Sequence, residues 1–219
     1  MNKKLIIFDL DGTLLDTLVD LQKAVNFALS KFDYPLRSLE QVRKDIGNGV
    51  AKLIERSIPG GKFNQNYDKC LDFFKEHYRQ NFDKNTHAYQ GMKDTLNKLV
   101  NEGYKITVAT NKIIDVAKIL LDKEYPGLFS YIQGDAIGVK KKPDPNMIDI
   151  IIKQYGVKLS EALYIGDTNV DEETALNAKI DYALVTYGYR TKEEIKNSCV
   201  CTNLIDTTID VYNYIKKLS

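Results

Sequence analysis

Two carboxylates with one residue between them lie near the start of the chain, directly after an apolar, β-prone run. Ile6, Ile7 and Phe8 lead into Asp9 and Asp11, and a glycine and a threonine follow. Asp and Gly are ordinary turn residues, so the pair alone also fits a surface turn. Two like charges this close repel each other unless a cation or a shared proton relieves them. The spacing therefore indicates either a metal site or an acid and base pair.

Four β-prone runs end in polar or acidic residues, and helical spacing of apolar residues occupies the segments between them. The runs are 2–13, 103–111, 130–135 and 161–167. A fifth run, 182–185, has the same composition, and 200–205 is predicted to add a short edge strand. Strands that alternate with helices predict an α/β fold, with a Rossmann-like parallel sheet covered by helices on both faces.

The polar residues after these strands are predicted to gather at one edge of the sheet, where ligands bind in open α/β folds. Beyond the first pair they are Thr110, Asn111, Lys142, Asp167 and Asp171. A nucleophilic carboxylate, a second acid, a hydroxyl, a lysine and a further acidic pair are the groups needed for metal-dependent phosphoryl transfer. Asp167 and Asp171 also fit a helix cap with an acidic first turn, and the two roles are compatible.

The chain resembles the haloacid dehalogenase-like hydrolases through four motifs in that family's order. They are Asp9-Leu10-Asp11-Gly12-Thr13, Val108-Ala109-Thr110, Lys142-Pro143-Asp144-Pro145 and Gly166-Asp167-Thr168-Asn169-Val170-Asp171. Three further fragments, 16–17, 46–50 and 181–189, are similar to the phosphoglycolate phosphatase-like branch, so the resemblance covers nearly the whole chain. Two positions depart from that branch. Lys179 replaces a usual glycine, and Gln90 replaces a common proline.

The resemblance implies that Asp9 attacks phosphorus and forms an aspartyl-phosphate, while Asp11 protonates the leaving alkoxide and then activates water. It also implies Mg²⁺, held by the carboxylates of Asp9 and Asp167 and the backbone carbonyl of Asp11. Asp171 is expected to orient the water ligands of the metal. The family's dehalogenases do not need an acid at the position of Asp11, so this residue favours a phosphatase or a phosphomutase.

The transferring phosphoryl group is expected to bind Thr110, Asn111 and Lys142. Thr110 would donate hydrogen bonds, Lys142 would supply charge, and the backbone amides of Leu10 and Asn111 would add donors. Thr13 is expected to satisfy the turn after the first strand instead of binding substrate.

From residue 17 to about residue 84 the β-alternation disappears and helical spacing takes over. The segment is predicted to be an all-helical insert after the first strand, and the resemblance implies that it is a cap over the active-site mouth. We therefore predict a hydrolase core of 1–15 and 85–219 and a cap of 16–84. Gly47, Asn48 and Gly49 form either a cap loop that approaches the substrate or a simple interhelical turn.

Charge and composition exclude some partners. The chain has 31 basic and 30 acidic residues, a net charge of +1, so no global field attracts nucleic acid. The sequence contains no run of eighteen apolar residues, so no membrane span is expected, and the first residues lack the pattern of a signal peptide. The three cysteines lack zinc-like spacing. A cytoplasmic protein, as a monomer or a homodimer, is expected.

The predicted function is a Mg²⁺-dependent phosphatase acting on a small phosphorylated metabolite, with 2-phosphoglycolate as the first candidate. Pyrophosphate, nucleotides and sugar phosphates are alternative substrates of the same chemistry. A phosphomutase that returns the phosphoryl group to a bound sugar is a second class of function. A non-catalytic binding protein on the same scaffold is a third.

Overall fold

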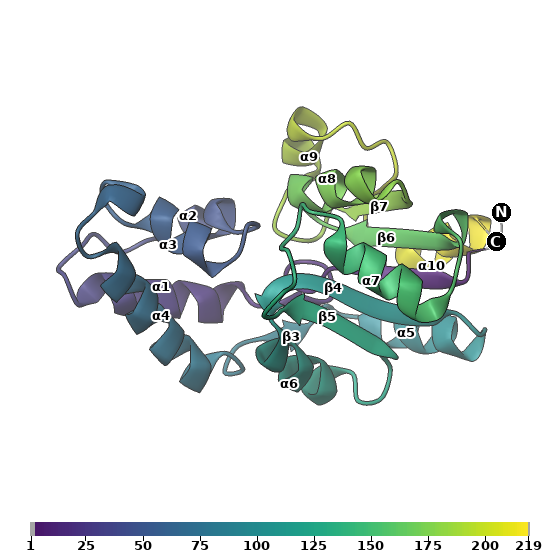
Figure 1. Cartoon of the computed structure of the whole chain (residues 1–219), viewed down its shortest axis with the longest axis horizontal. Coiled ribbons are helices and arrows are strands. Elements are labelled where there is room, and N and C mark those ends of the chain that lie inside the picture. Colours follow the sequence, from purple (N-terminus) through teal and green to yellow (C-terminus); the bar gives the residue numbers. More distant parts are fainter. Residues whose placement is uncertain (1–2, 219) are drawn as a thin grey trace. The chain divides into compact units, whose positions relative to one another are not determined.

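The computed structural model describes residues 3–218, which form two compact units. The first comprises the residues up to Leu15 and those from Ala88 onward, and the second is Asp16–His87. Two short strands, β2 (Leu15–Asp16) and β3 (His87–Ala88), pair with each other and contain the positions at which the chain leaves and re-enters the first unit (Figure 1). The second unit thus extends three residues beyond the predicted limit of 84.

Six parallel strands form the sheet of the first unit, in the order β5-β4-β1-β6-β7-β8. They are β1 (Leu5–Phe8), β4 (Lys105–Ile113), β5 (Tyr131–Asp135), β6 (Ala162–Gly166), β7 (Asp181–Val185) and β8 (Leu204–Ile205). Each strand lies within or overlaps one of the six predicted runs, and the predicted Rossmann-like α/β fold is confirmed. Asn2, where the first predicted run begins, lies outside the described residues.

The strand ends differ from prediction where the site is built. β1 ends at Phe8, so residues 9–13 form a loop and not the end of a strand. β4 continues to Ile113, and its register against β5 shifts between Ala109 and Ile113. Thr110 and Asn111 therefore lie inside an irregular part of β4 and do not follow it. Irregularities of this kind re-aim side chains, and sequence alternation does not reveal them.

Helices cover both faces of the sheet (Figure 1). The helices of this unit are α5 (Met92–Asn101), α6 (Ile114–Glu124), α7 (Asn146–Tyr155), α8 (Asn169–Ala178), α9 (Lys192–Ser198) and α10 (Thr208–Lys217), with a 3₁₀ turn at Leu159–Glu161. α7 and α8 pack on one face, α5 and α6 pack on the other, and α10 packs against α5 and β8. This is the arrangement in which crossover helices connect parallel strands.

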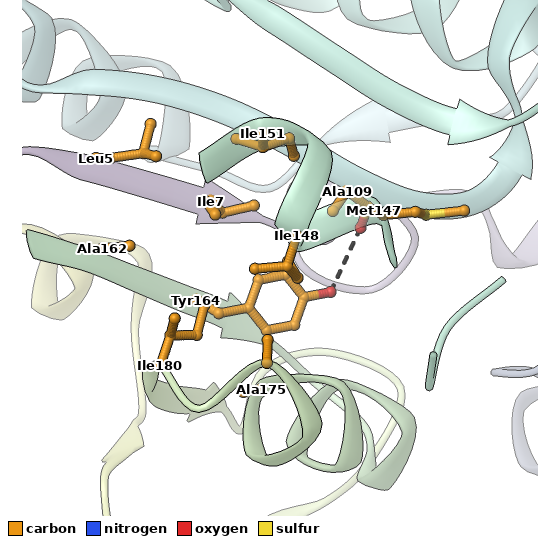
Figure 2. Close-up of a cluster of buried hydrophobic side chains, with 11 residues drawn as sticks. Leu5, Ile7, Ala109, Met147, Ile148, Ile151, Ala162, Tyr164, Ala175 and Ile180 are labelled. Atoms are coloured by element: carbon orange, nitrogen blue, oxygen red, sulfur yellow. Dashed lines mark hydrogen bonds between the residues drawn. The ribbon is translucent and has the colours of Figure 1, made fainter. Parts of the chain in front are cut away.

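The core under α7 and α8 holds the central strands in place (Figure 2). Leu5 and Ile7 of β1 are fully buried against Ile148 and Ile151 of α7. Full burial of such a side chain stabilises the fold by about 1.5–3 kcal/mol. The ring of Tyr164 belongs to the same cluster, and its hydroxyl oxygen lies 3.4 Å from the carbonyl oxygen of Ala109. Tyr164 therefore extends from the core to the polar edge of the sheet.

The second unit is built from helices. They are α1 (Leu18–Ser30), α2 (Leu39–Asp45), α3 (Val50–Ser57), α4 (Tyr67–Asn81) and a 3₁₀ turn at Gly61–Phe63. α1 and α4 pack along each other and bury Val25 and Phe74. Asp20 in the first turn of α1 is buried and accepts hydrogen bonds from the backbone N–H groups of Asn85 and Thr86. The start of α1 is thereby tied to the returning chain.

The helices and the cysteines of the described residues bear on the predictions about a membrane span and about zinc-like cysteine spacing. Within 3–218, no helix combines the length and the apolar character that a membrane crossing needs. Cys70 is buried in α4, and all three cysteines are free thiols.

Candidate active site

The loop after β1 carries the first two carboxylates. The backbone N–H of Asp9 still donates to the carbonyl of Ile165 at 2.8 Å, whereas the carbonyl of Leu10 accepts from Leu14 at 3.0 Å, so the chain turns back at once. Gly12 has φ 89°, and a Cβ at this position would lie 2.3 Å from Oδ2 of Asp167. Glycine is thus required both for the backbone conformation and for the close approach to Asp167.

Lys142 is the centre of the buried network. Its Nζ donates to Oδ1 of Asp9 at 2.6 Å, to Oδ1 of Asp171 at 2.8 Å and to the hydroxyl of Tyr164 at 2.9 Å. The side chain is 2% exposed. An ammonium group has three donors, and these contacts use all three. Lys142 therefore holds Asp9 in one orientation and offsets part of the negative charge around it.

The side chain of Asn111 fixes the backbone of Lys142. Its amide donates to the carbonyl of Lys142 at 3.1 Å, and its Oδ1 accepts from the N–H of Lys142 at 2.8 Å. Thr110 Oγ1 accepts from the backbone N–H of Lys112 at 3.2 Å. Asn111, which directly follows Thr110 in β4, thus comes together with Lys142 and, through Lys142, with Asp9, and its side chain positions Lys142.

Asp171 caps α8 and supports Lys142 at the same time. Its Oδ2 accepts from the backbone N–H and the hydroxyl of Thr168, at 3.0 and 2.7 Å, and from the N–H of Asp167 at 3.2 Å. Its Oδ1 accepts from Lys142 and from Tyr164, both at 2.8 Å. The predicted helix cap is present as a capping box. So many donors stabilise the ionised form of Asp171.

Asp167 is anchored from the other side of the site. Its Oδ2 accepts from the backbone N–H of Tyr189 at 2.7 Å, and its Oδ1 lies 3.5 Å from the hydroxyl of Thr13. A Cβ on Gly188 would lie 2.6 Å from the Cβ of Asp167. The segment 188–189 therefore approaches Asp167 as closely as a backbone can.

The electrostatics of the cluster favour a cation. Carboxylate oxygens of Asp9, Asp167 and Asp171 lie within 4.8 Å of one another. Burial raises the pKa of Asp9 to about 7, although Lys142 opposes the rise. Burial and the charge of Asp171 raise the pKa of Asp167 well above its usual value. Burial would also raise the pKa of Asp171, but the charge of Lys142 and the hydrogen bonds from Lys142, Thr168 and Tyr164 together lower that pKa.

The donor set fits a hard divalent cation. Four carboxylates, counting Asp11, outnumber the cations that the described residues bring to them. These cations are the ammonium groups of Lys142 and Lys112 and the guanidinium of Arg190, whose charge lowers the pKa of Asp167. The side chains of Asp9 and Asp167 end in carboxylate oxygen atoms, the kind of ligand that Mg²⁺ prefers. A cation between them would favour the ionised carboxylates that burial disfavours.

Comparison with known proteins agrees with this geometry. The family model described as haloacid dehalogenase-like hydrolase matches residues 6–185. The chain belongs to the haloacid dehalogenase-like hydrolases. The phosphoglycolate phosphatase of Aliivibrio fischeri is 34% identical over 207 residues, which cover 89% of each protein. This finding confirms the resemblance inferred from the four sequence motifs.

Solved structures share the whole fold. A crystal structure from Lactobacillus delbrueckii subsp. bulgaricus superposes with a TM-score of 0.93 at 27% identity and covers 98% of this chain and 99% of that one. The structure of a predicted phosphoglycolate phosphatase from Haemophilus somnus has a TM-score of 0.89 at 28% identity and covers 98% of each chain. The similarity therefore includes both units of this hydrolase.

Three contributors to the site of this hydrolase were not predicted. Lys112 pairs with Asp11, Tyr164 bonds Lys142 and Asp171, and the N–H of Tyr189 bonds Asp167. Tyr164 had no separate signal because an aromatic residue inside an apolar strand indicates core packing. Lys112 directly follows Thr110 and Asn111, and a lysine so close to a candidate site was the available signal.

The predicted cap loop lies between α2 and α3 of the second unit. Gly47 and Gly49 have φ of 135° and 82°, which side chains with a Cβ rarely adopt. The Asn48 side chain accepts from the guanidinium of Arg56 at 2.8 Å, and Arg56 also donates to the carbonyl of Asp45 at 2.7 Å. The loop is therefore a glycine-dependent turn whose asparagine is held by an arginine.

Proposed function

We propose that this protein is a Mg²⁺-dependent phosphatase that hydrolyses small phosphomonoesters through an aspartyl-phosphate, with 2-phosphoglycolate as the preferred substrate. The observation that supports the chemistry most directly is the buried carboxylate of Asp9, held at 2.6 Å by Lys142 with Asp11 two residues further on. The proposal for the substrate rests on the relatives named phosphoglycolate phosphatase.

In the first step a carboxylate oxygen of Asp9 attacks phosphorus, the ester P–O bond breaks, and Asp11 gives its proton to the departing alkoxide. Lys142 keeps Asp9 oriented and lowers the repulsion between its carboxylate and the dianionic ester. Burial of Asp9 excludes water, which strengthens these interactions.

In the second step Asp11 takes a proton from water, the water oxygen attacks phosphorus, and the P–O bond to Asp9 breaks. Phosphate leaves and Asp9 is regenerated. Thr110 and Lys142 are proposed to bind the transferring oxygens in both steps. The support for Thr110 is its position in the irregular part of β4, next to Asn111, whose side chain bonds the backbone of Lys142. Asn111 contributes by fixing the backbone of Lys142.

The carboxylates of Asp9 and Asp167 and the carbonyl of Asp11 are proposed to hold Mg²⁺. When bound, the ion supplies charge neutralisation at the phosphoryl oxygens and between the carboxylates. Asp171 is proposed to act through its contacts with Lys142, Thr168 and the N–H of Asp167, because donors already surround both of its oxygens.

The second unit is proposed to be the specificity cap, with Gly47, Asn48 and Gly49 as the substrate loop. The support is the arginine that holds Asn48, since such a contact gives a surface loop one conformation. A cytoplasmic location and a monomeric or dimeric state remain predictions.

The function is tested by free phosphate release from 2-phosphoglycolate, pyrophosphate, sugar phosphates and nucleotides, with and without Mg²⁺. Asp9→Asn should abolish release, and Asp94→Asn, on the exposed first turn of α5, should leave it unchanged. The preferred member of the panel identifies the substrate class.

Two results would contradict the proposal. Transfer of phosphate to a second position of a bound sugar, with almost no free phosphate, would indicate a phosphomutase. No reaction with any member by the folded protein in Mg²⁺ would favour a binding protein.

A further inference from the structure

We propose that Lys112 is a positioning residue for Asp11, holding its carboxyl group where, in the protonated form, it gives its proton to the leaving group. The inference rests on the proposed function and deepens it. It assigns to the two lysines of the site two separate tasks, one for the nucleophile and one for the acid.

The contact is direct and enclosed. Nζ of Lys112 lies 2.8 Å from Oδ1 of Asp11, and the lysine side chain is only 5% exposed. The Asp11 side chain is 18% exposed, so it is the more accessible partner of the pair. Burying an ammonium group is costly, and the pairing with a carboxylate offsets that cost. A lysine enclosed in this way is a fixed part of the site and not a surface charge.

The backbone of β4 directs Lys112 toward Asp11. The register of β4 shifts between Ala109 and Ile113, and the N–H of Lys112 donates to Thr110 Oγ1 at 3.2 Å. The neighbouring Gly134 allows this path, because a Cβ there would lie 2.8 Å from the carbonyl oxygen of Lys112. The irregular strand therefore serves Thr110 and Lys112 together.

The contacts of the two lysines differ. Lys142 uses its three donors on Asp9, Asp171 and Tyr164, and Lys112 directs a donor at Asp11. Removal of the Lys112 ammonium leaves the contact between Lys142 and Asp9 in place. The nucleophile is then still oriented, and the group that loses an ionic contact is the acid.

This division predicts an effect that depends on the leaving group. An ester with a poor leaving group needs protonation in the transition state, and an ester with a good leaving group does not. If Lys112 instead gripped the phosphoryl group or only stabilised the fold, its loss would slow both kinds of ester equally. The ratio of the two rates therefore separates positioning of the acid from the other roles.

The test measures kcat/KM with phenyl phosphate, the poor leaving group, and with 4-nitrophenyl phosphate, the good one, in saturating Mg²⁺. The two esters are similar in shape, and kcat/KM includes only the steps up to departure of the leaving group. Hydrolysis of the aspartyl-phosphate, a step common to both esters, does not affect kcat/KM.

Lys112→Met should lower kcat/KM for phenyl phosphate by about 10- to 100-fold, a share of the general-acid contribution, and for 4-nitrophenyl phosphate by less than about threefold. Lys112→Arg, which keeps a cationic donor, should restore most of the loss. Lys105→Met, at the exposed start of the same strand, is the matched control and should behave as wild type. In an Asp11→Asn background, Lys112→Met should not change the ratio further.

Equal losses of Lys112→Met on the two esters would overturn the inference while leaving the phosphatase proposal intact. Wild-type protein that hydrolyses neither these esters nor any phosphate of the panel would instead overturn the proposed function and this inference with it. Thermal unfolding accompanies each variant, and Lys112→Gln replaces Lys112→Met if the latter does not fold, with the same expected ratio.

Discussion

The sheet edge of the first unit and the helix surfaces of the second hold their charges in different ways. At the sheet edge, the side chains of Lys142 and Asp171 are at most 2% exposed, and each makes several hydrogen bonds. In the second unit, Lys44 and Lys52 are more than half exposed and pair with glutamates on their own helices. Buried pairs are costly to break and exposed pairs contribute little. The side chains around the proposed nucleophile are therefore tightly constrained, whereas the surface proposed to select substrates can vary with little loss of stability.

The largest effect is expected where the constraint is strongest. Lys142→Met should lower kcat by about 10²- to 10³-fold, because Asp9 loses its orientation and the phosphoryl group loses a nearby positive charge. The melting temperature should also fall, since two buried carboxylates lose their partner. Lys140→Met, in the same loop and paired with the partly exposed Asp144, is the control for both measurements. Similar kinetics for the two variants would contradict the difference between buried and exposed lysines.

A smaller and different effect is expected in the second unit. Arg56→Met removes the donor to Asn48 and should raise KM for the preferred substrate by about tenfold, the equivalent of one hydrogen bond, with kcat nearly unchanged. Steady-state kinetics measure both constants. Lys52→Met, in the same helix, should change neither. A loss in kcat with unchanged KM would argue against a role of the loop in substrate selection.

The raised pKa values of Asp9 and Asp167 make stability depend on pH and on the metal. Asp9 has a folded pKa of about 7 against an ordinary value of 3.8, so the folded state binds more protons than the unfolded state between these values. Stability of the metal-free protein should therefore fall as pH rises through this window. Mg²⁺ should raise the melting temperature by about 5 °C or more at high pH, and by less at low pH.

Thermal unfolding at about pH 5 and about pH 8, with and without the metal, measures this linkage. Asp9→Asn should weaken both the pH dependence and the shift caused by Mg²⁺. A shift of equal size at the two pH values, or one that Asp9→Asn leaves unchanged, would contradict the proposed ligation.

The smallest effect concerns a position outside both regions. Lys179 ends α8 with φ 56°, where the sequence resemblance leads one to expect glycine. Left-handed backbone costs a residue with a Cβ about 1 kcal/mol, so Lys179→Gly should stabilise the protein by about that amount in urea unfolding. Lys153→Gly, inside α7, should do the opposite. A destabilised Lys179→Gly would show that its side chain makes a contact worth more than the strain.

Which functional residues gather at the edge of the sheet could largely be predicted from the sequence. They lie at or after the ends of β-prone runs, and parallel strands end at one edge. Asp9, Lys142 and Asp171 do lie together there. The position of Thr110 and Asn111 was harder to predict from the sequence, because the register shift in β4 depends on how closely the neighbouring Gly134 approaches the backbone of Lys112 and Ile114. A close approach between two backbone segments produces no periodic pattern of residues in the sequence.

Contacts between distant residues were the least predictable. The pairing of Lys112 with Asp11 joins positions 101 residues apart, and the hydroxyl of Tyr164 reaches Lys142 from the middle of a core cluster. Both side chains have an ordinary alternative, a solvated lysine and a buried aromatic ring. Only the folded arrangement distinguishes these alternatives.

The proposed mechanism requires that Asp9 becomes phosphorylated during turnover. The most direct measurement mixes the protein with 2-phosphoglycolate and Mg²⁺, quenches with acid during steady-state turnover, and reduces the product with borohydride, which converts an aspartyl-phosphate into homoserine. Peptide mass spectrometry should find homoserine at position 9 in wild type, more of it in Asp11→Asn if that variant slows hydrolysis of the intermediate, and none in Asp9→Asn. Homoserine at another aspartate, or none at position 9 in samples that release phosphate, would contradict the account.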